Sequence, residues 1–174
     1  VSVPGLTENF CGAVRPGHFD GVTTVVARLF AIVQPEVAVF GQKDYQQQLV
    51  IRYMTEDLSL PIRIITAATV REDDGLAMSS RNAYLTDEER VVAPKLHEVL
   101  EYIGARLQSG DRDFEVMEQK GAEELRAAGF ELDYLAIRRA ENLTQPDRDC
   151  DDLVVLAAGK LGNARLIDNV VVTV

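Results

Sequence analysis

Apolar positions in the first third of the chain repeat with helical and strand spacing in turn. Residues 20–34 and 43–58 carry apolar side chains at three- and four-residue intervals, which predicts two helices, each with one inner face. The run 37–40 predicts a short buried strand, and 62–66, after a proline, predicts a second strand. Helix, strand, helix and strand with short connections indicate a parallel sheet of an α/β domain.

From residue 86 the pattern changes. Thr86 and Glu89 have the spacing of a capping box, with Thr86 as N-cap and Glu89 at the third helical position. Pro94 lacks an amide proton, so we expect a break near Ala93 and a new helix to about Leu107.

A further amphipathic helix is expected at 113–128, followed by strand-like runs at 132–138, 153–158 and 165–173. Helices followed by strands predict a small α+β domain with an antiparallel sheet. We therefore place the domain boundary within 82–87, giving domains of residues 1–84 and 85–174.

Composition sets limits on class and compartment. The chain has 174 residues, of which 47% are hydrophobic and 26% charged, which is enough for one or two domains with a real core. No apolar run reaches the ~18 residues of a membrane span, and no signal-peptide pattern is present. Cys11, Cys150, His18 and His97 do not have zinc-ligand spacing, so we expect reduced, structural thiols in a cytoplasmic protein.

Charge is distributed unevenly. The net charge of −10 argues against a surface that coats nucleic acid. Residues 1–84 carry 7 basic and 9 acidic side chains, a net charge of −2, whereas residues 85–174 carry 11 and 19, a net charge of −8. An anionic ligand would meet less repulsion on the first part. The alternative is that acidic helices simply keep the second part soluble.

Two polar clusters precede predicted helices. In RPGHFDGV, at 15–22, Arg15 and His18 could receive an anion at a helix N-terminus, or the loop could simply be capped by Asp20. In FGQKDYQQ, at 40–47, a strand ends and a helix begins, which is where open parallel sheets bind ligands.

The residue types of the second cluster suit a nucleotide. Gly41 lets a ligand approach the backbone, Lys43 can neutralise phosphate, and Asp44 can accept from sugar hydroxyls. Gln47 lies one turn after Lys43 and can point the same way. The alternative is that Asp44 supports the helix dipole while Lys43 lies in solvent.

The third cluster, Met78-Ser79-Ser80-Arg81-Asn82, follows the charged turn 71–75. Hydroxyl, guanidinium and amide donors are concentrated there. Either this is a turn with ordinary polar caps, or a loop that closes over an anion.

Taken together, the three clusters resemble the recurring segments of the pantothenate synthetase (pantoate–β-alanine ligase) family, in order and at fitting distances, and LGNARLIDN at 161–169 also fits. The resemblance implies a nucleotidyltransferase-superfamily fold: a partial Rossmann-like parallel-sheet domain followed by a small α+β lid domain. It implies ATP- and Mg²⁺-dependent condensation of pantoate with β-alanine through a pantoyl adenylate, releasing AMP and pyrophosphate. It also implies a cytoplasmic homodimer with no nucleic-acid or membrane partner.

The resemblance also assigns roles to residues of this chain. The ATP phosphates would be held by the catalytic group Lys43, Ser79, Ser80 and Arg81. The rest of the ATP site would be Gly41 and Asp44 at the ribose and Val70 and Met78 at adenine. Gln47 would bind pantoate, and Arg15 and His18 would line the acceptor side of the pocket.

The family's His-x-Gly-His motif, a second pantoate-binding glutamine and acidic magnesium contacts are not found in these residues. We therefore expect the chain to be the later portion of such an enzyme, with no metal ligand of its own and no useful activity alone. Two other hypotheses stay open: a related nucleotidyltransferase that stops at a nucleotidyl product, and a non-catalytic nucleotide-binding module.

Overall fold

The computed structural model describes residues 1–174, which form two compact units, Val1–Ala68 and Thr69–Val174. The units divide earlier than the boundary predicted within 82–87. The physical reason is that the segment after Ala68 is held by the second unit. Arg71 pairs with Asp168, and the buried Leu76 belongs to the core of that unit.

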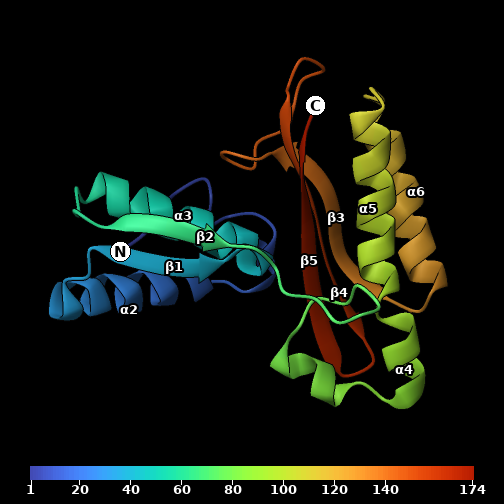
Figure 1. Cartoon of the computed structure of the whole chain (residues 1–174), viewed down its shortest axis with the longest axis horizontal. Coiled ribbons are helices and arrows are strands. Elements are labelled where there is room, and N and C mark those ends of the chain that lie inside the picture. Colours follow the sequence, from blue (N-terminus) through green and yellow to red (C-terminus); the bar gives the residue numbers. More distant parts are fainter. The chain divides into compact units, whose positions relative to one another are not determined.

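Unit 1 contains the predicted helix–strand–helix–strand order. Its elements are α1 (Cys11–Val14), α2 (His18–Val33), β1 (Val37–Gly41), the short 3₁₀ turn η1 (Gln42–Asp44), α3 (Tyr45–Asp57) and β2 (Arg63–Ala67). The two strands are parallel, with Val37 opposite Arg63 and Gly41 opposite Ala67 (Figure 1). The predicted parallel sheet is confirmed, and both strands end at one edge.

Helices α2 and α3 cover one face of this sheet. Phe30 of α2 meets Phe40 of β1 edge to face, with ring centroids 6.5 Å apart. Arg52 of α3 donates to Thr66 of β2, which lies opposite Phe40 in the register. Leu49 and other side chains of α3 are fully buried, as the predicted inner face requires.

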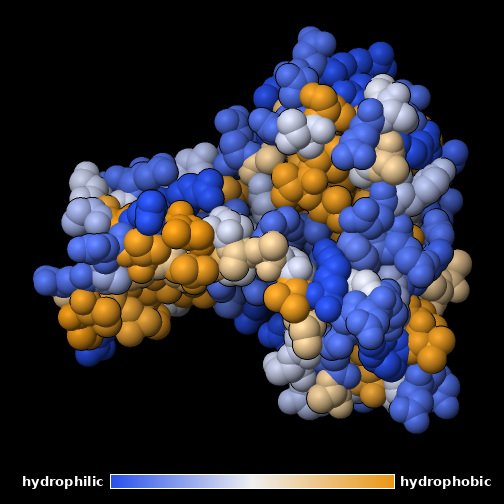
Figure 2. All heavy atoms as spheres, viewed as in Figure 1, coloured by the Kyte–Doolittle hydropathy of each residue, from blue (hydrophilic) through white to orange (hydrophobic).

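The opposite face of the sheet is open. The pattern predicts β1 as a buried strand, but Val39 is 61% exposed, and Ile65 beside it in β2 is also exposed. Helix α2 also presents Leu29 and Val33 to solvent. The visible face of unit 1 in Figure 2 shows the resulting apolar surface. The periodicity identifies the apolar positions correctly, but not which of them this chain covers.

Unit 2 contains the predicted helices followed by strands. Its elements are η2 (Ser80–Tyr84), α4 (Asp87–Val92), α5 (Lys95–Gln108), α6 (Phe114–Ala127), β3 (Glu131–Arg139), β4 (Asp152–Leu161) and β5 (Ala164–Thr173). The strands form an antiparallel sheet in the order β3-β4-β5. Helices α5 and α6 lie on one side of it (Figure 1), α5 against β4 and β5, and α6 against β3.

Local signals set these helix boundaries. Thr86 and Glu89 form the predicted capping box, and α4 ends before Pro94, where α5 begins. The core between helices and sheet is apolar and includes Leu96, Leu100, Ile103, Leu107, Met117, Leu125, Ile137 and Leu153. A Cβ at Gly121 of α6 would lie about 3 Å from side chains of α5 and β3, so only glycine allows this close packing.

Candidate functional site

The turn after β1 carries the predicted phosphate and ribose residues. Gly41 ends the strand, Lys43 and Asp44 lie in η1, and α3 follows directly. Gly41 has extended backbone, and a Cβ there would meet nothing within 4 Å. The fold therefore does not require glycine at this position, and the backbone at the carboxyl end of β1 is open to a ligand.

Asp44 does not cap α3 with its side chain, although it occupies the N-cap position. It is exposed, and Lys43 is half-buried. The first N–H groups of α3 thus lie beside a cation at the carboxyl edge of the sheet. That combination favours an anion such as phosphate.

The three consecutive glutamines near the start of α3, residues 46–48, have different roles. Gln46 is buried: its Nε2 donates to the carbonyls of Leu6 (2.7 Å) and Asn9 (2.8 Å), and its Oε1 accepts from the N–H of Cys11. This amide holds the 6–11 loop against α3.

Gln48, also buried, accepts from Arg52 and from the hydroxyl of Thr66, which joins α3 to the end of β2. Gln47, between them, is half-buried and makes no side-chain hydrogen bond within the chain. Its amide is therefore available to a ligand. Sequence reasoning singled out Gln47 and missed the structural roles of its neighbours.

Arg15 and His18 are brought together at the start of α2. Arg15 Nη1 lies 3.0 Å from His18 Nε2, and the His18 ring packs beside Phe19. Asp20 lies in the first turn but does not cap the helix; the N-cap is Gly17, with a left-handed backbone. Two groups able to bind an anion thus meet at an uncapped helix N-terminus.

In unit 2, Val70 and Met78 are paired across a small hairpin. The N–H of Met78 donates to the carbonyl of Val70 at 2.9 Å, and Arg71 bridges Ala77 in antiparallel fashion. Val70 is 66% and Met78 49% exposed. Two neighbouring exposed apolar side chains form a surface suited to a flat ring such as a base.

The predicted loop 79–81 is the start of a short helix rather than an irregular loop. Ser79 is the N-cap of η2, and its hydroxyl accepts from the N–H of Arg81 at 3.2 Å. Ser80 and Arg81 are exposed, and neither side chain makes a hydrogen bond or ion pair. Ser79 thus has a capping role, while Ser80 and Arg81 present free donors.

Arg81 differs in this respect from most arginines of unit 2. Arginine–carboxylate pairs are Arg71–Asp168, Arg90–Asp74, Arg106–Asp111, Arg138–Glu118, Arg139–Asp147, Arg148–Asp113 and Arg165–Asp133. The positive charge of Arg81 is not neutralised in this way. In a unit with an acidic excess, it remains able to attract an anionic ligand.

Sequence reasoning missed Arg71 and Asp168. Burial alone would raise the pKa of the Asp168 carboxyl, but His97, Arg71 and the N–H of Asn169 outweigh it and hold the pKa below its usual value. The sequence marks Arg71 only as part of a charged turn, although its place beside the predicted loop was a signal.

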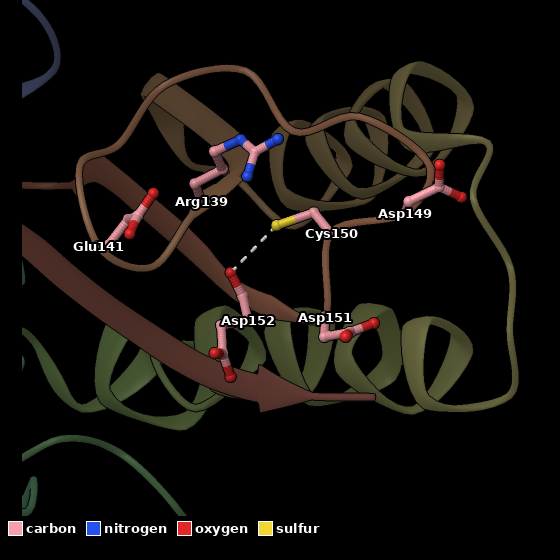
Figure 3. Close-up of a pocket in the computed structure, with 6 residues that line it drawn as sticks. All are labelled: Arg139, Glu141, Asp149, Cys150, Asp151 and Asp152. Carbon is pink, nitrogen blue, oxygen red and sulfur yellow. Dashed lines mark hydrogen bonds between the residues drawn. The ribbon is translucent and has the colours of Figure 1, made fainter.

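One surface hollow of about 250 Å³ lies away from all predicted site residues. It is lined by Arg139, Glu141, Asp149, Cys150, Asp151 and Asp152 (Figure 3). The thiol of Cys150 donates to the carbonyl of Asp152 at 3.4 Å. Four carboxylates outweigh the one guanidinium, so the hollow has the wrong charge for a polyphosphate.

No group of three or more His, Cys, Asp or Glu side chains is placed to hold a metal ion. No helix combines the length and apolarity needed to cross a membrane.

Comparisons with known proteins agree with the resemblance. The sequence profile of pantoate-beta-alanine ligase matches residues 1–171. A pantothenate synthetase of Pseudomonas putida (strain GB-1) is 57% identical over 169 residues, covering 97% of this chain and 59% of that protein. The chain thus spans about three fifths of this relative's length.

Solved structures extend the comparison. Pantothenate synthetase from Thermus thermophilus matches with a TM-score of 0.92 and 48% identity, covering 98% of this chain and 62% of that one. Pantoate-beta-alanine ligase from Francisella tularensis, complexed with beta-gamma ATP and beta-alanine, matches with a TM-score of 0.71 and 29% identity, covering 98% and 56%. With nearly its whole length matched in sequence and in structure, the chain belongs to the pantoate-beta-alanine ligase family.

Proposed function

We propose that this chain supplies the later part of an ATP-dependent ligase that joins pantoate to β-alanine. The observation that carries the proposal is the unpaired Arg81 guanidinium beside the free Ser80 hydroxyl, in a unit whose other arginines are largely paired with carboxylates. Family membership supplies the reaction. The Francisella relative carries both an ATP compound and β-alanine, which agrees with these substrates.

The reaction has two steps. A carboxylate oxygen of pantoate attacks the α-phosphorus of ATP, and the bond to the bridging oxygen breaks, releasing pyrophosphate and leaving pantoyl adenylate. The amine of β-alanine then attacks the acyl carbon, the amide bond forms, AMP leaves and the amine loses a proton. Negative charge develops on the α-phosphate and on pyrophosphate, so the chain must supply positively polarised donors.

Four residues would supply those donors. Lys43, Ser79, Ser80 and Arg81 would hold the phosphates. A guanidinium can bind two phosphate oxygens at once, whereas Lys43 acts as a point charge. Because the Ser79 hydroxyl already caps η2, we expect Ser79 to contribute less to phosphate binding than the other three residues.

The remaining roles follow from residue chemistry. Gly41 and Asp44 would receive the ribose, and the exposed pair Val70 and Met78 would flank adenine. The free amide of Gln47 would bind pantoate, donating to its carboxylate and accepting from its hydroxyl.

Arg15 and His18 would line the acceptor side, where β-alanine carries a carboxylate. Residues 85–174 would act as a lid that closes over bound ATP. The complete enzyme would be a cytoplasmic homodimer.

Magnesium is not assigned to this chain. Asp44 is the only carboxylate among the proposed site residues, and Mg²⁺ keeps several waters and binds largely through substrate phosphates. Mg²⁺ would enter with ATP as part of the substrate.

The test compares two proteins: this chain alone, and an extended protein in which it is joined to the part of the Pseudomonas putida relative outside the match. Each is incubated with ATP, pantoate and β-alanine. The proposal is supported if the extended protein forms the amide and AMP while the chain alone forms almost none. A stable adenylate without amide would indicate a nucleotidyltransferase, and ATP binding without turnover a nucleotide-binding module.

A further inference from the structure

A partly buried ion pair joins the segment before the Ser79–Arg81 loop to the last strand of unit 2. Arg71 binds Asp168 of β5 with both arms of its guanidinium, Nη1 to Oδ2 at 2.7 Å and Nη2 to Oδ1 at 3.1 Å. The Asp168 side chain is 2% exposed. The two residues are 97 positions apart in the sequence. Such a fork fixes the direction of the arginine as well as its distance.

The same guanidinium also holds the turn that follows it. Arg71 Nη1 donates to the carbonyl of Gly75 at 3.1 Å, and its backbone bridges Ala77. Gly75 has a left-handed backbone, which closes the turn tightly. Asp168 is thus connected through the Arg71 side chain to the first residue of the hairpin and to its turn.

His97 of α5 closes the cluster from a third element. Its Nδ1 lies 3.5 Å from Asp168 Oδ2, an ion-pair distance at which Nδ1 makes no aligned hydrogen bond. Its ring lies under the turn, because a Cβ at Gly75 would come within 2.9 Å of His97 Cδ2. On the outer side, Nε2 lies 3.7 Å from Glu101.

Further hydrogen bonds lead from the hairpin to the proposed phosphate donors. Asn82 Nδ2 donates to the carbonyl of Ala77 at 3.2 Å, and the N–H of Asn82 donates to the carbonyl of Ser79 at 3.0 Å. The Ser79 hydroxyl then accepts from the N–H of Arg81. Hydrogen bonds, joined by short stretches of backbone through the hairpin, therefore connect Asp168 to Arg81.

We infer that Asp168, acting through Arg71 and His97, is a positioning residue that holds Ser79, Ser80 and Arg81 ready for the ATP phosphates. Asp168 does not touch substrate; it fixes the base of the segment that does. The inference rests on the function proposed above for these three residues. A buried ion pair is weak evidence of stabilisation by itself, whereas holding one conformation is a role that such a pair can serve.

The experiment uses Asp168→Asn and Arg71→Lys in the extended protein. The first keeps the shape of the side chain and removes its charge; the second keeps the charge and removes the fork. Asp133→Asn is the matched control, since it breaks the 2.8 Å pair with Arg165, which also joins β5 to another part of the unit. Hydrogen exchange of residues 72–82 and single-turnover adenylate formation are measured.

Arg71→Lys should show faster exchange confined to 72–82. Both variants should slow adenylation on the order of tenfold to a hundredfold. Asp133→Asn should change neither quantity, and pantoate affinity should stay within about twofold of its original value. Unchanged exchange or unchanged adenylation in Arg71→Lys would overturn the inference. If Asp168→Asn speeds hydrogen exchange throughout unit 2, the result for Arg71→Lys alone decides whether the positioning role is correct.

Arg81→Ala separates this inference from the proposed function. If Arg81→Ala slows adenylation while the two variants above do not, the positioning role is wrong and the proposed function stands. If Arg81→Ala has no effect on adenylation, the proposed function of the loop fails, and with it the positioning role.

Discussion

The carboxylate of Glu89 occupies the space where a side chain at position 162 would begin. An ideal Cβ on Gly162 would overlap Glu89 Oε1, and Gly162 has φ +55° in the turn between β4 and β5. Glu89 Oε2 accepts from the N–H of Thr86 at 2.9 Å. The capping box of α4 is therefore packed against the β4–β5 turn, and the two features constrain each other.

Gly162→Ala should therefore destabilise unit 2 in two ways. Alanine is strained at this backbone conformation, which costs about 1 kcal/mol, and its methyl group must displace Glu89, which breaks half of the capping box at a further cost of about 1 kcal/mol. Gly110→Ala is the control, because Gly110 has φ +92° but open space around it. Urea unfolding followed by circular dichroism should show the larger loss for Gly162→Ala; equal losses would mean that Glu89 moves aside freely.

Lys43→Ala in the extended protein should slow adenylation by roughly a hundredfold, with little effect on folding. Losing one preorganised donor costs about 3 kcal/mol at the transition state. Lys43 is half-buried beside the first turn of α3, whereas the exposed Lys120 on α6 is in no ion pair and provides the control. Single-turnover adenylate formation is the measurement. A rate in Lys43→Ala equal to that of Lys120→Ala would remove Lys43 from the site.

Gln47→Ala and Gln46→Ala should give opposite phenotypes. The Gln47 side chain makes no hydrogen bond within the chain, so its loss should weaken pantoate binding roughly tenfold while ATP affinity and stability are retained. Gln46 satisfies two loop carbonyls, so its loss should cost about 1–3 kcal/mol of stability. Titration calorimetry and urea unfolding of both variants check this. Equal weakening of pantoate and ATP by Gln47→Ala would contradict the assignment.

Asp168 should make stability depend on pH in the acid range. Its pKa is lower in the folded state than the value of about 3.9 in an unfolded chain, so its contribution is present above pH 4 and is lost as the pH falls through the folded-state pKa. Asp168→Asn should cost about 3 kcal/mol at neutral pH, because Arg71 loses a buried partner. The difference from the original protein should shrink below about pH 4. Unfolding curves measured from pH 7 to pH 3 that keep a constant difference would contradict this.

The sequence predicted features that depend on neighbouring residues better than features that depend on contacts between distant parts of the chain. Local signals were reliable: Thr86 and Glu89 cap α4 as expected, and Pro94 separates two helices, because caps and prolines act within one turn. Apolar spacing located every strand. It did not show that Val39 is exposed, because periodicity identifies an apolar face but not what covers it.

The same distinction between local and long-range interactions applies to the candidate site. Residue chemistry beside element ends made Gly41 and Lys43 candidates, and the family resemblance assigned Ser80 and Arg81 to the phosphates; these assignments stay predictions. Arg71 and Asp168 could not be paired from spacing, since strand β5 meets the hairpin only in the folded unit. Successive residues on a helix are rotated by about 100°, so the three adjacent glutamines face different surroundings that only the tertiary structure reveals.

The open face of the β1–β2 sheet has a calorimetric consequence. Apolar surface that is already hydrated adds nothing to the heat capacity when the chain unfolds. Val39, Ile65 and the outer side of α2 are in this state, whereas the helix–sheet interface of unit 2 is dry. The isolated chain should therefore absorb heat in two transitions. The first, from unit 1, should be broad and carry a small heat-capacity step for its length; the second, from unit 2, should be sharp and carry most of the change.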